Sequence, residues 1–330
     1  MILVTGGTGF VGAYIIRELV MREYAVRAIR RRDYQPFFID DTIWHKVEWV
    51  ECDILDPVGL FDAMQGVELV IHAAAMVSFH KSERELLYQT NVTGTANVVN
   101  MAIESGIERF IHISSVAALG RTANNEIVNE EKKWQEGIRQ THYAISKYQA
   151  ELEVWRGMGE GMQITILNPS TVVGFGDWNN SSCGIFKNVY NEFPWYSNGV
   201  NGFVDVEDLA RACVLLMEKK IYQERFIING DNWSFRRLFD TMAEALHKKK
   251  PSREAGPMLG ALAWRWEKLS SLFTGKKPLL TRETARIAQS NTQFDHQKLL
   301  QALPGFQFTP LETSIRNAAA KYLDHYGRNS

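Results

Sequence analysis

The sequence predicts an α/β fold with a doubly wound parallel sheet and a smaller, mostly helical C-terminal domain. Over the first 170 residues, short apolar runs alternate with segments of helical periodicity, and the first run opens directly into a glycine-rich turn. Strands that alternate with helices indicate βαβ units. Strands buried on both faces of a parallel sheet carry near-continuous apolar runs, as these do.

The expected elements follow in chain order, with strands preceding helices. We expect strands at 1–4, 24–29, 47–52, 69–72, 110–113 and 164–167, and helices at 11–23, 57–64, 86–105 and 141–157. Beyond residue 167 we expect a strand and helix over 203–219, a strand at 225–229 and helices from 235 onward. The first domain is expected to comprise 1–168 plus the return of 203–230 to the sheet, and the second 169–202 plus 231–330.

Composition excludes several classes of protein. Of 330 residues, 45% are hydrophobic and 23% charged, which is ordinary globular composition, and the net charge is −1. A near-neutral chain lacks the basic field of a nucleic-acid-binding protein. Three widely spaced cysteines suit a reducing compartment, the histidines show no metal-ligand spacing, and no apolar run is long enough for a membrane span. With no charged, apolar signal peptide at the start, we expect a cytoplasmic protein without a metal.

The turn after the first strand carries glycines at spacing three: Gly6, Gly9 and Gly12. Glycine lets a phosphate approach the backbone, and the free N–H groups at the following helix start hold a pyrophosphate. At a strand–helix junction this pattern indicates a Rossmann-type dinucleotide site that also includes the turn residues Phe10 and Val11. The first domain is therefore expected to bind the cofactor and the second the substrate.

The residues after the second strand indicate which cofactor is bound. An acidic residue there holds the ribose hydroxyl of NAD, but this chain has Arg30, Arg31 and Arg32 before Asp33. Guanidinium groups suit the extra phosphate of NADP, so we favour NADP over NAD, with Arg30 and Arg31 as ligands. The alternative is that these arginines are only solvated at a sheet edge. Further cofactor contacts are expected from residues after the third and fourth strands: Asp53, Ile54, Ala73, Ala74 and Ala75.

A second motif indicates acid–base chemistry. Tyr143 and Lys147 are spaced i and i+4, so they share one face of a helix. A nearby ammonium favours the phenolate and moves the tyrosine pKa toward a useful range. Ser114 and Ser115 follow a strand at the edge where such sheets bind ligands, and a serine hydroxyl there can hold a substrate oxygen.

With segments 72–75, 91–95, 168–170 and 203–206, these motifs resemble those of the extended short-chain dehydrogenases/reductases, also called the NAD-dependent epimerase/dehydratase family. The resemblance covers about residues 1–250. It implies that Ser115 is the catalytic hydroxyl, Tyr143 the acid/base and Lys147 the partner of the ribose hydroxyls. It also implies a homodimer paired through helices 86–105 and 141–157. The remaining implied contacts around the cofactor come from Asn91, Pro169, Ser170 and Thr171.

Two departures from family patterns narrow the branch. Dehydratases carry Asp-Glu directly after the catalytic hydroxyl residue, where this chain has Val116-Ala117. Many sugar-nucleotide epimerases carry an arginine where this chain has Asn201, although Arg211, Arg236 or Arg237 could substitute. Residues 26–31 also resemble the dihydroflavonol-reductase and 3β-hydroxysteroid-dehydrogenase-like branch.

Aromatic residues suggest the character of the substrate. Candidate pocket residues are Phe79, Phe175, Phe186 and Tyr190, with packing of the small domain as the alternative for each. Residues 258–273 have helical apolar spacing and are interpreted as an interfacial helix or lid, or as a packed helix.

Together these observations predict a ketone reductase or alcohol dehydrogenase acting on an apolar or aromatic small-molecule carbonyl or alcohol. The alternatives are a nucleotide-sugar epimerase and a non-enzymatic cofactor-sensing protein of the same fold.

Overall fold

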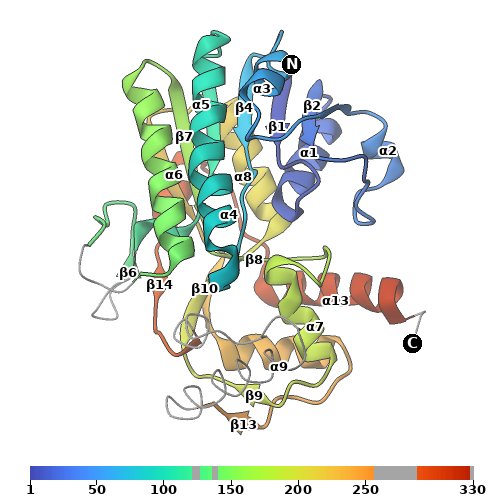
Figure 1. The fold of residues 1–330 in the computed structure, drawn as a ribbon. Coiled ribbons are helices and arrows are strands. Elements are labelled where there is room, and N and C mark those ends of the chain that lie inside the picture. Colours follow the sequence, from blue (N-terminus) through green and yellow to red (C-terminus); the bar gives the residue numbers. More distant parts are fainter. Residues whose placement is uncertain (121–126, 136–139, 256–287, 328–330) are drawn as a thin grey trace.

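The fold is taken from a computed structural model that describes residues 1–120, 127–135, 140–255 and 288–327. Its centre is a parallel seven-stranded sheet with the order β11-β7-β5-β4-β1-β2-β3 (Figure 1). The strand order reverses beside β1, which is the doubly wound arrangement expected from the sequence. The strands are β1 (Ile2–Thr5), β2 (Val26–Arg30), β3 (Glu48–Glu51), β4 (Leu69–His72), β5 (Arg109–Ile113), β7 (Gln163–Pro169) and β11 (Glu224–Ile228).

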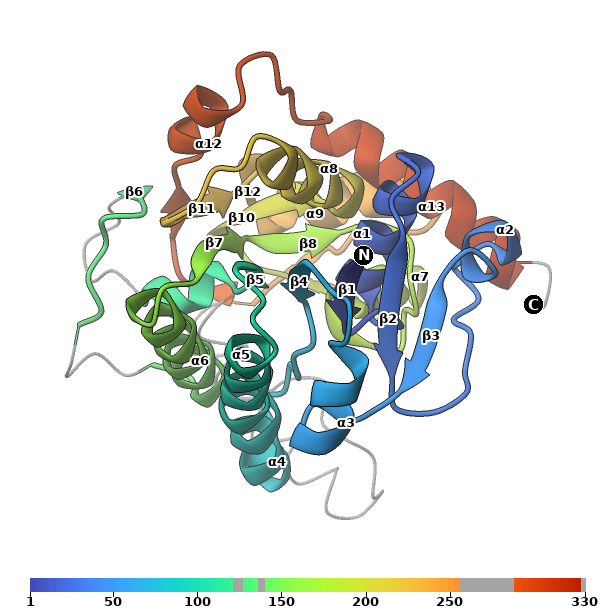
Figure 2. The ribbon, with the colours of Figure 1, turned by 90° about the horizontal axis from the view of Figure 1, so that it is seen from above.

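Helices cover both faces of this sheet (Figure 2). One apolar layer joins the sheet to α1 (Phe10–Met21) and α8 (Val206–Glu218). The opposite layer joins it to α3 (Pro57–Ala63), α5 (Gly94–Glu104) and α6 (His142–Gly159). Because the strands are buried on both faces, their side chains are apolar on both, as the sequence pattern predicted.

A second domain lies beyond the carboxyl ends of the strands, in the lower half of Figure 1. Its three-stranded sheet has the order β12-β10-β8. Its core packs this sheet against three helices. The elements are β8 (Thr171–Val173), β10 (Val200–Asp205), β12 (Asp231–Ser234), α7 (Gly184–Tyr190), α9 (Phe235–Ala245) and α13 (Leu311–Gly327).

One sequence expectation about the sheets is wrong. Residues 203–230 were expected to return to the large sheet, but Phe203 pairs with Thr171 in the small one, and only α8 and β11 return. The reason is that the chain leaves the large sheet after Pro169 and continues directly into β8, which offers β10 a free parallel edge.

Short elements complete the chain. Two small pairs link distant segments: β6 (Ile127–Val128) with β14 (Gln293–Phe294), and β9 (Trp195–Tyr196) with β13 (Arg253–Glu254). The remaining helices include α2 (Asp41–Trp44), α4 (Arg84–Tyr88) and α12 (Gln297–Ala302). Within the described ranges, no helix is both long and apolar enough to cross a membrane. The segment 258–273 lies outside the described residues.

Candidate active site

The glycine turn is a cradle that side chains would fill. Gly6 has φ +70°, and a Cβ there would lie 2.7 Å from the Ala74 Cα. A Cβ on Gly12 would lie only 2.2 Å from the Gly6 carbonyl oxygen, which also accepts the Gly9 N–H at 2.9 Å. Helix α1 begins immediately after Gly9, and no side chain caps its first turn. This cradle fits the pyrophosphate of a dinucleotide.

The two residues inside the turn have different surroundings. The Phe10 ring packs edge-on against Tyr14 at 5.8 Å and also contacts the core of the second domain. Val11 is half-buried against the α1 layer. Their backbone amides, rather than their side chains, therefore remain the candidate cofactor contacts.

The arginines after β2 lie at the carboxyl edge of the sheet. The Arg30 guanidinium pairs with Asp33 and lies 5.5 Å from the Trp44 ring centre. Arg31 and Arg32 are exposed, and Arg32 lies over the Tyr34 ring. Two of the three cations are thus accessible to a ligand at this edge.

The turns after β3 and β4 complete the predicted adenosine side. The Asp53 carboxylate accepts the Leu55 N–H at 3.0 Å, while Ile54 is buried and its carbonyl accepts the Asn97 side-chain amide at 3.1 Å. The Ala74 N–H donates to the Thr5 hydroxyl at 3.2 Å. The neighbouring Ala73 and Ala75 have small side chains that leave the backbone accessible beside the glycine turn.

The predicted catalytic residues come together at the ends of β5 and α6. The Ser115 and Tyr143 side chains are hydrogen-bonded to each other, and Ser115 Oγ also accepts the Ala117 N–H at 3.1 Å. Ser114 instead points into the protein, so Ser115 is the serine that faces the tyrosine. Lys147 is 2% exposed, and its ammonium donates to the Ile113 carbonyl at 3.0 Å.

The direction of the Tyr143 pKa differs from the sequence expectation. Burial raises the pKa of Tyr143, and the hydrogen bond with Ser115 opposes that rise. Burial has the opposite effect on a cation: it lowers the pKa of Lys147 to about 8, although the negative charge of Glu151 raises that pKa in part. Tyr143 is therefore a neutral phenol at neutral pH, able to donate a proton.

A buried hydrogen-bond chain, missed at the sequence level, connects the glycine turn to the catalytic helix. The Thr5 hydroxyl lies 2.7 Å from His72 Nδ1, and His72 Nε2 lies 2.9 Å from the Thr95 hydroxyl, which donates to the Asn91 carbonyl. The Asn91 side chain then binds the Met76 backbone twice and donates to Ser146 of α6 at 3.0 Å.

Asn91 itself lies in a π-helical turn, Gln89–Thr93, between α4 and α5. Its side chain is buried and satisfied by protein groups, which gives it a tying role between β4, α5 and α6. Burial lowers the pKa of His72 to about 3, so this histidine stays neutral within the chain. The sequence signal for this chain was the polar residue His72 inside an otherwise apolar strand.

The turn after β7 is fixed by backbone and side-chain bonds. The Ser170 N–H donates to the Ile228 carbonyl at 3.0 Å, and the Thr171 hydroxyl accepts the Asn201 amide at 2.8 Å. Pro169 ends β7 and is buried. These three residues thus lie where the two sheets diverge, at the carboxyl end of β7.

Only one of the four predicted pocket aromatics adjoins the catalytic residues. The Phe79 ring lies 5.8 Å from the Tyr143 ring, edge to face. Phe175 and Phe186 instead pack on Tyr322 of α13 at 5.0 and 4.9 Å. Tyr190 packs on Trp178 at 5.2 Å. For these three residues, the packing alternative fits the structure better than the pocket one.

The three arginines considered as diphosphate ligands have protein partners. Arg211 donates to Asp208 and to the Gln307 carbonyl, both at 2.7 Å. Arg237 pairs with Glu312 at 2.6 Å. Arg236 lies over the Tyr196 ring at 4.5 Å. All three side chains are thus engaged by other groups of the protein.

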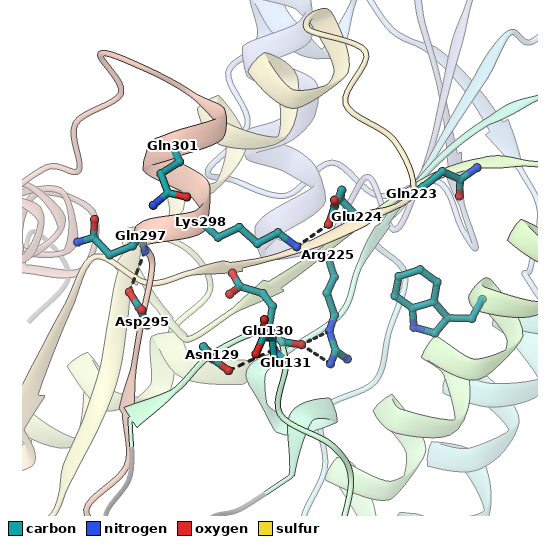
Figure 3. A pocket seen from close by; sticks show the side chains of 11 residues that line it. Asn129, Glu130, Glu131, Gln223, Glu224, Arg225, Asp295, Gln297, Lys298 and Gln301 are labelled. Atoms are coloured by element: carbon teal, nitrogen blue, oxygen red, sulfur yellow. Dashed lines mark hydrogen bonds and ion pairs between the residues drawn. The ribbon is translucent and has the colours of Figure 1, made fainter.

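A polar groove of about 630 Å³ lies elsewhere, beside the edge strand β11 (Figure 3). It is lined by residues from the 129–131 segment, β11 and α12, and holds the Lys298–Glu224 ion pair. None of the predicted site residues lines it. Its Arg225 reaches inward to Glu151 of α6 at 3.1 Å.

The glycine cradle at the carboxyl edge of the sheet, with Ser115, Tyr143 and Lys147 nearby, is the arrangement that the sequence predicted for a dinucleotide-dependent enzyme of the Rossmann class. Comparison with known proteins extends this conclusion. The chain belongs to the NAD dependent epimerase/dehydratase family, whose profile matches residues 2–228. The family consists of NAD-dependent oxidoreductases, epimerases and dehydratases, so the resemblance expected from the motifs is confirmed.

Individual relatives agree with the reductase-like branch. The chain is 29% identical to a putative dihydroflavonol 4-reductase of Synechocystis over 98% of this chain and 94% of the relative. It is 30% identical to sterol demethylase protein B of Methylococcus capsulatus over 78% of each chain. The crystal structure of gox2253 superposes with a TM-score of 0.82 at 29% identity, covering 98% of both chains.

Proposed function

We propose that the protein is a ketone reductase or alcohol dehydrogenase that acts on an apolar or aromatic carbonyl or alcohol and uses NADP in preference to NAD. The observation that carries the proposal is the contact of Tyr143 with both Ser115 and Phe79. Two hydroxyls beside an aromatic ring can hold a carbonyl oxygen while its apolar substituent packs on the ring.

The roles of the residues follow from this arrangement. Ser115 Oγ orients the substrate oxygen, and the Tyr143 hydroxyl donates a proton to it in reduction or takes the proton in oxidation. Lys147, buried beneath Tyr143 on the same helix, supplies positive charge that stabilises the developing phenolate. A nicotinamide cofactor bound at the glycine cradle would supply or accept the hydride. Because the Tyr143 pKa is raised, reduction is favoured at neutral pH and oxidation at higher pH.

The choice of NADP depends on the arginines after β2. Arg31 is exposed and available for a 2′-phosphate, and Arg30 lies next to it, paired with Asp33 beside Trp44. The glycine cradle and the Asp53 turn would hold the pyrophosphate and the adenosine. The Pro169–Thr171 turn would hold the carboxamide end through its backbone.

One observation favours this proposal over a nucleotide-sugar epimerase: Arg211 and Arg237, which could replace the arginine missing at Asn201, are engaged by protein partners. A buried diphosphate needs free guanidinium or amide donors. A second observation argues against a dehydratase, since Val116 and Ala117 follow Ser115 in place of a pair of carboxylates. The names of the two relatives, a putative dihydroflavonol 4-reductase and sterol demethylase protein B, also support an apolar substrate.

The test is a panel of aromatic and aliphatic ketones and aldehydes with NADPH as reductant. We expect carbonyl-dependent NADPH oxidation, faster for aromatic than for small aliphatic ketones. NADPH left unconsumed with every carbonyl, together with interconversion of a nucleotide sugar without net cofactor use, would contradict the proposal.

A further inference from the structure

Glu151 is a buried carboxylate one helical turn beyond Lys147, on the same face of α6. It is 2% exposed, and a carboxylate removed from water must be matched by hydrogen bonds and charge. Side chains from three neighbouring strand ends and from α6 itself supply four donors. These are Ser114 Oγ at 2.8 Å, Asn168 Nδ2 at 2.9 Å, Arg225 Nη1 at 3.1 Å and Trp155 Nε1 at 3.4 Å.

Two of these bonds fix the backbone at Ser115. Ser114 is the preceding residue, and its hydroxyl donates to Glu151 Oε2. The Asn168 amide donates both to Glu151 Oε2 and to the Ser115 carbonyl at 3.0 Å. Glu151 Oε2 therefore holds Ser114, at the end of β5, and Asn168, near the end of β7. Together these two residues fix the backbone of Ser115, the residue that faces Tyr143.

Lys147 lies one helical turn before this carboxylate on α6, and the charge of Glu151 raises the pKa of its ammonium. The strands packed against Lys147 contribute the histidines His72 and His112, which stack at 5.2 Å and whose pKa values are lowered by burial, so both are neutral. Tyr143, on its own helix, is a neutral phenol. Among the described residues, Glu151 is thus the anion that acts on the Lys147 ammonium.

Arg225 shares the same carboxylate from the opposite side. Its guanidinium enters from the polar groove, where it also donates to the Glu130 carbonyl (Figure 3). A further hydrogen bond goes to the Lys132 carbonyl. The Glu130 carboxylate is engaged by the Ile227 N–H at 2.8 Å. The charge of Glu151 is therefore divided between Arg225 and Lys147.

We propose that Glu151 is a positioning residue of the Ser115–Tyr143–Lys147 site. It fixes the Ser115 backbone and supplies the counter-charge of Lys147. Arg225, which pairs with the same carboxylate, reduces the effect of that counter-charge on Lys147. The proposal rests on the proposed function, in which Tyr143 and Lys147 carry the acid–base chemistry. It predicts effects of opposite sign from the two partners. A merely structural role of the cluster would not produce opposite signs.

The test compares Glu151→Gln, which removes the charge and keeps the shape, with Arg225→Gln. The ionisation midpoint of Lys147 is followed by NMR in cofactor-free protein with carbon-13-labelled lysine, and the signal is assigned with Lys147→Arg. We expect Glu151→Gln to lower the midpoint by about one pH unit and Arg225→Gln to raise it. Arg225→Lys, which restores a cation, is the matched control and should keep the parent midpoint.

The pH profile of turnover provides the second readout. The profile of Glu151→Gln should be displaced by about one unit toward lower pH. Because the Lys147 pKa is about 8, the ammonium fraction, and with it the rate, should fall only about twofold at pH 7 and about tenfold well above pH 8. Midpoints that stay unchanged, or that move in the same direction in both variants, would overturn the proposal. If Glu151→Gln does not fold, an unchanged or lowered midpoint in Arg225→Gln alone would overturn it. The titration needs no turnover, so failure of the proposed function would appear separately as an inactive parent protein.

Discussion

Substitution of Gly12 by alanine should damage the cofactor cradle although it favours the helix. Alanine in a helix interior is about 1 kcal/mol better than glycine by propensity alone. Here the new Cβ would lie 2.2 Å from the Gly6 carbonyl oxygen and 2.8 Å from its carbon, far inside ordinary contact. Either α1 or the turn must move by about 1 Å, and overpacking of this kind costs about 1–3 kcal/mol. We expect a net loss of about 0–2 kcal/mol in the free energy of unfolding.

The larger effect should be on cofactor affinity. Gly6 also accepts the Gly9 N–H, so moving it distorts the amides that would face the pyrophosphate. Losing one hydrogen bond to a charged group costs about 1.5–3 kcal/mol, or about a 10–100-fold rise in the NADPH dissociation constant.

A matched control is Gly159→Ala, also in a helix, where a Cβ would meet nothing within 4 Å. This variant should keep the parent affinity and gain up to about 1 kcal/mol of stability. The assays are NADPH fluorescence titration and urea unfolding. Parent-like affinity in Gly12→Ala would refute the cradle argument.

Three further predictions follow from other parts of the structure. Arg31→Ala should raise the NADPH dissociation constant about tenfold and leave that of NADH unchanged, and equal parent affinities for both cofactors would refute the NADP assignment. His72→Gln should flatten the dependence of stability on acid pH. In the parent, the pKa of His72 is about 3 in the folded state and 6.5 in the unfolded state. The parent should therefore lose about 1.4 kcal/mol of unfolding free energy per pH unit between pH 6.5 and pH 3, and the variant should lack this contribution. A parent-like slope in urea titrations would contradict this. Leu152, 47% exposed on α6, should lie in a homodimer contact, so Leu152→Glu should convert a dimer to a monomer in light scattering. A parent protein that is already monomeric would exclude that contact.

The large sheet could be predicted from the sequence because its signals are local. The strand that ends at His72 is a continuous apolar run, which is typical of a strand buried on both faces. Glycines at 6, 9 and 12 mark a strand–helix turn that lets a phosphate approach the backbone. The small sheet could not be predicted, because the pairing of Phe203 in β10 with Thr171 in β8 depends on where the chain leaves β7. That choice is tertiary, and no local pattern around Phe203 encodes it.

The proximity of Tyr143 and Lys147 was predictable for a similar reason, and that of the residues around them was not; the catalytic role of the two residues stays a prediction. Tyr143 and Lys147 share a helix face because they are spaced i and i+4. Glu151 continues the same spacing, so its place on that face could also have been predicted from the sequence. Its partners Asn168 and Arg225 come from separate strands, so their convergence needed the fold. The direction of the Tyr143 pKa was also missed, since burial cannot be judged from spacing.

Aromatic content was the least informative signal. Phe79 and Phe186 are the same residue type, yet one adjoins Tyr143 and the other fills the core beside Tyr322. A ring buries similar area in either place, so composition alone does not separate a substrate pocket from a packed core.

The central claim is that the Tyr143 hydroxyl carries the proton of the reaction. The most direct measurement is turnover of an accepted carbonyl by Tyr143→Phe beside Tyr148→Phe, which removes the hydroxyl of a half-buried tyrosine on the same helix that stacks on Trp134 at 4.2 Å. We predict that Tyr143→Phe loses turnover by about 100-fold or more while binding NADPH like the parent, and that Tyr148→Phe keeps its activity. Normal turnover by Tyr143→Phe would contradict the account.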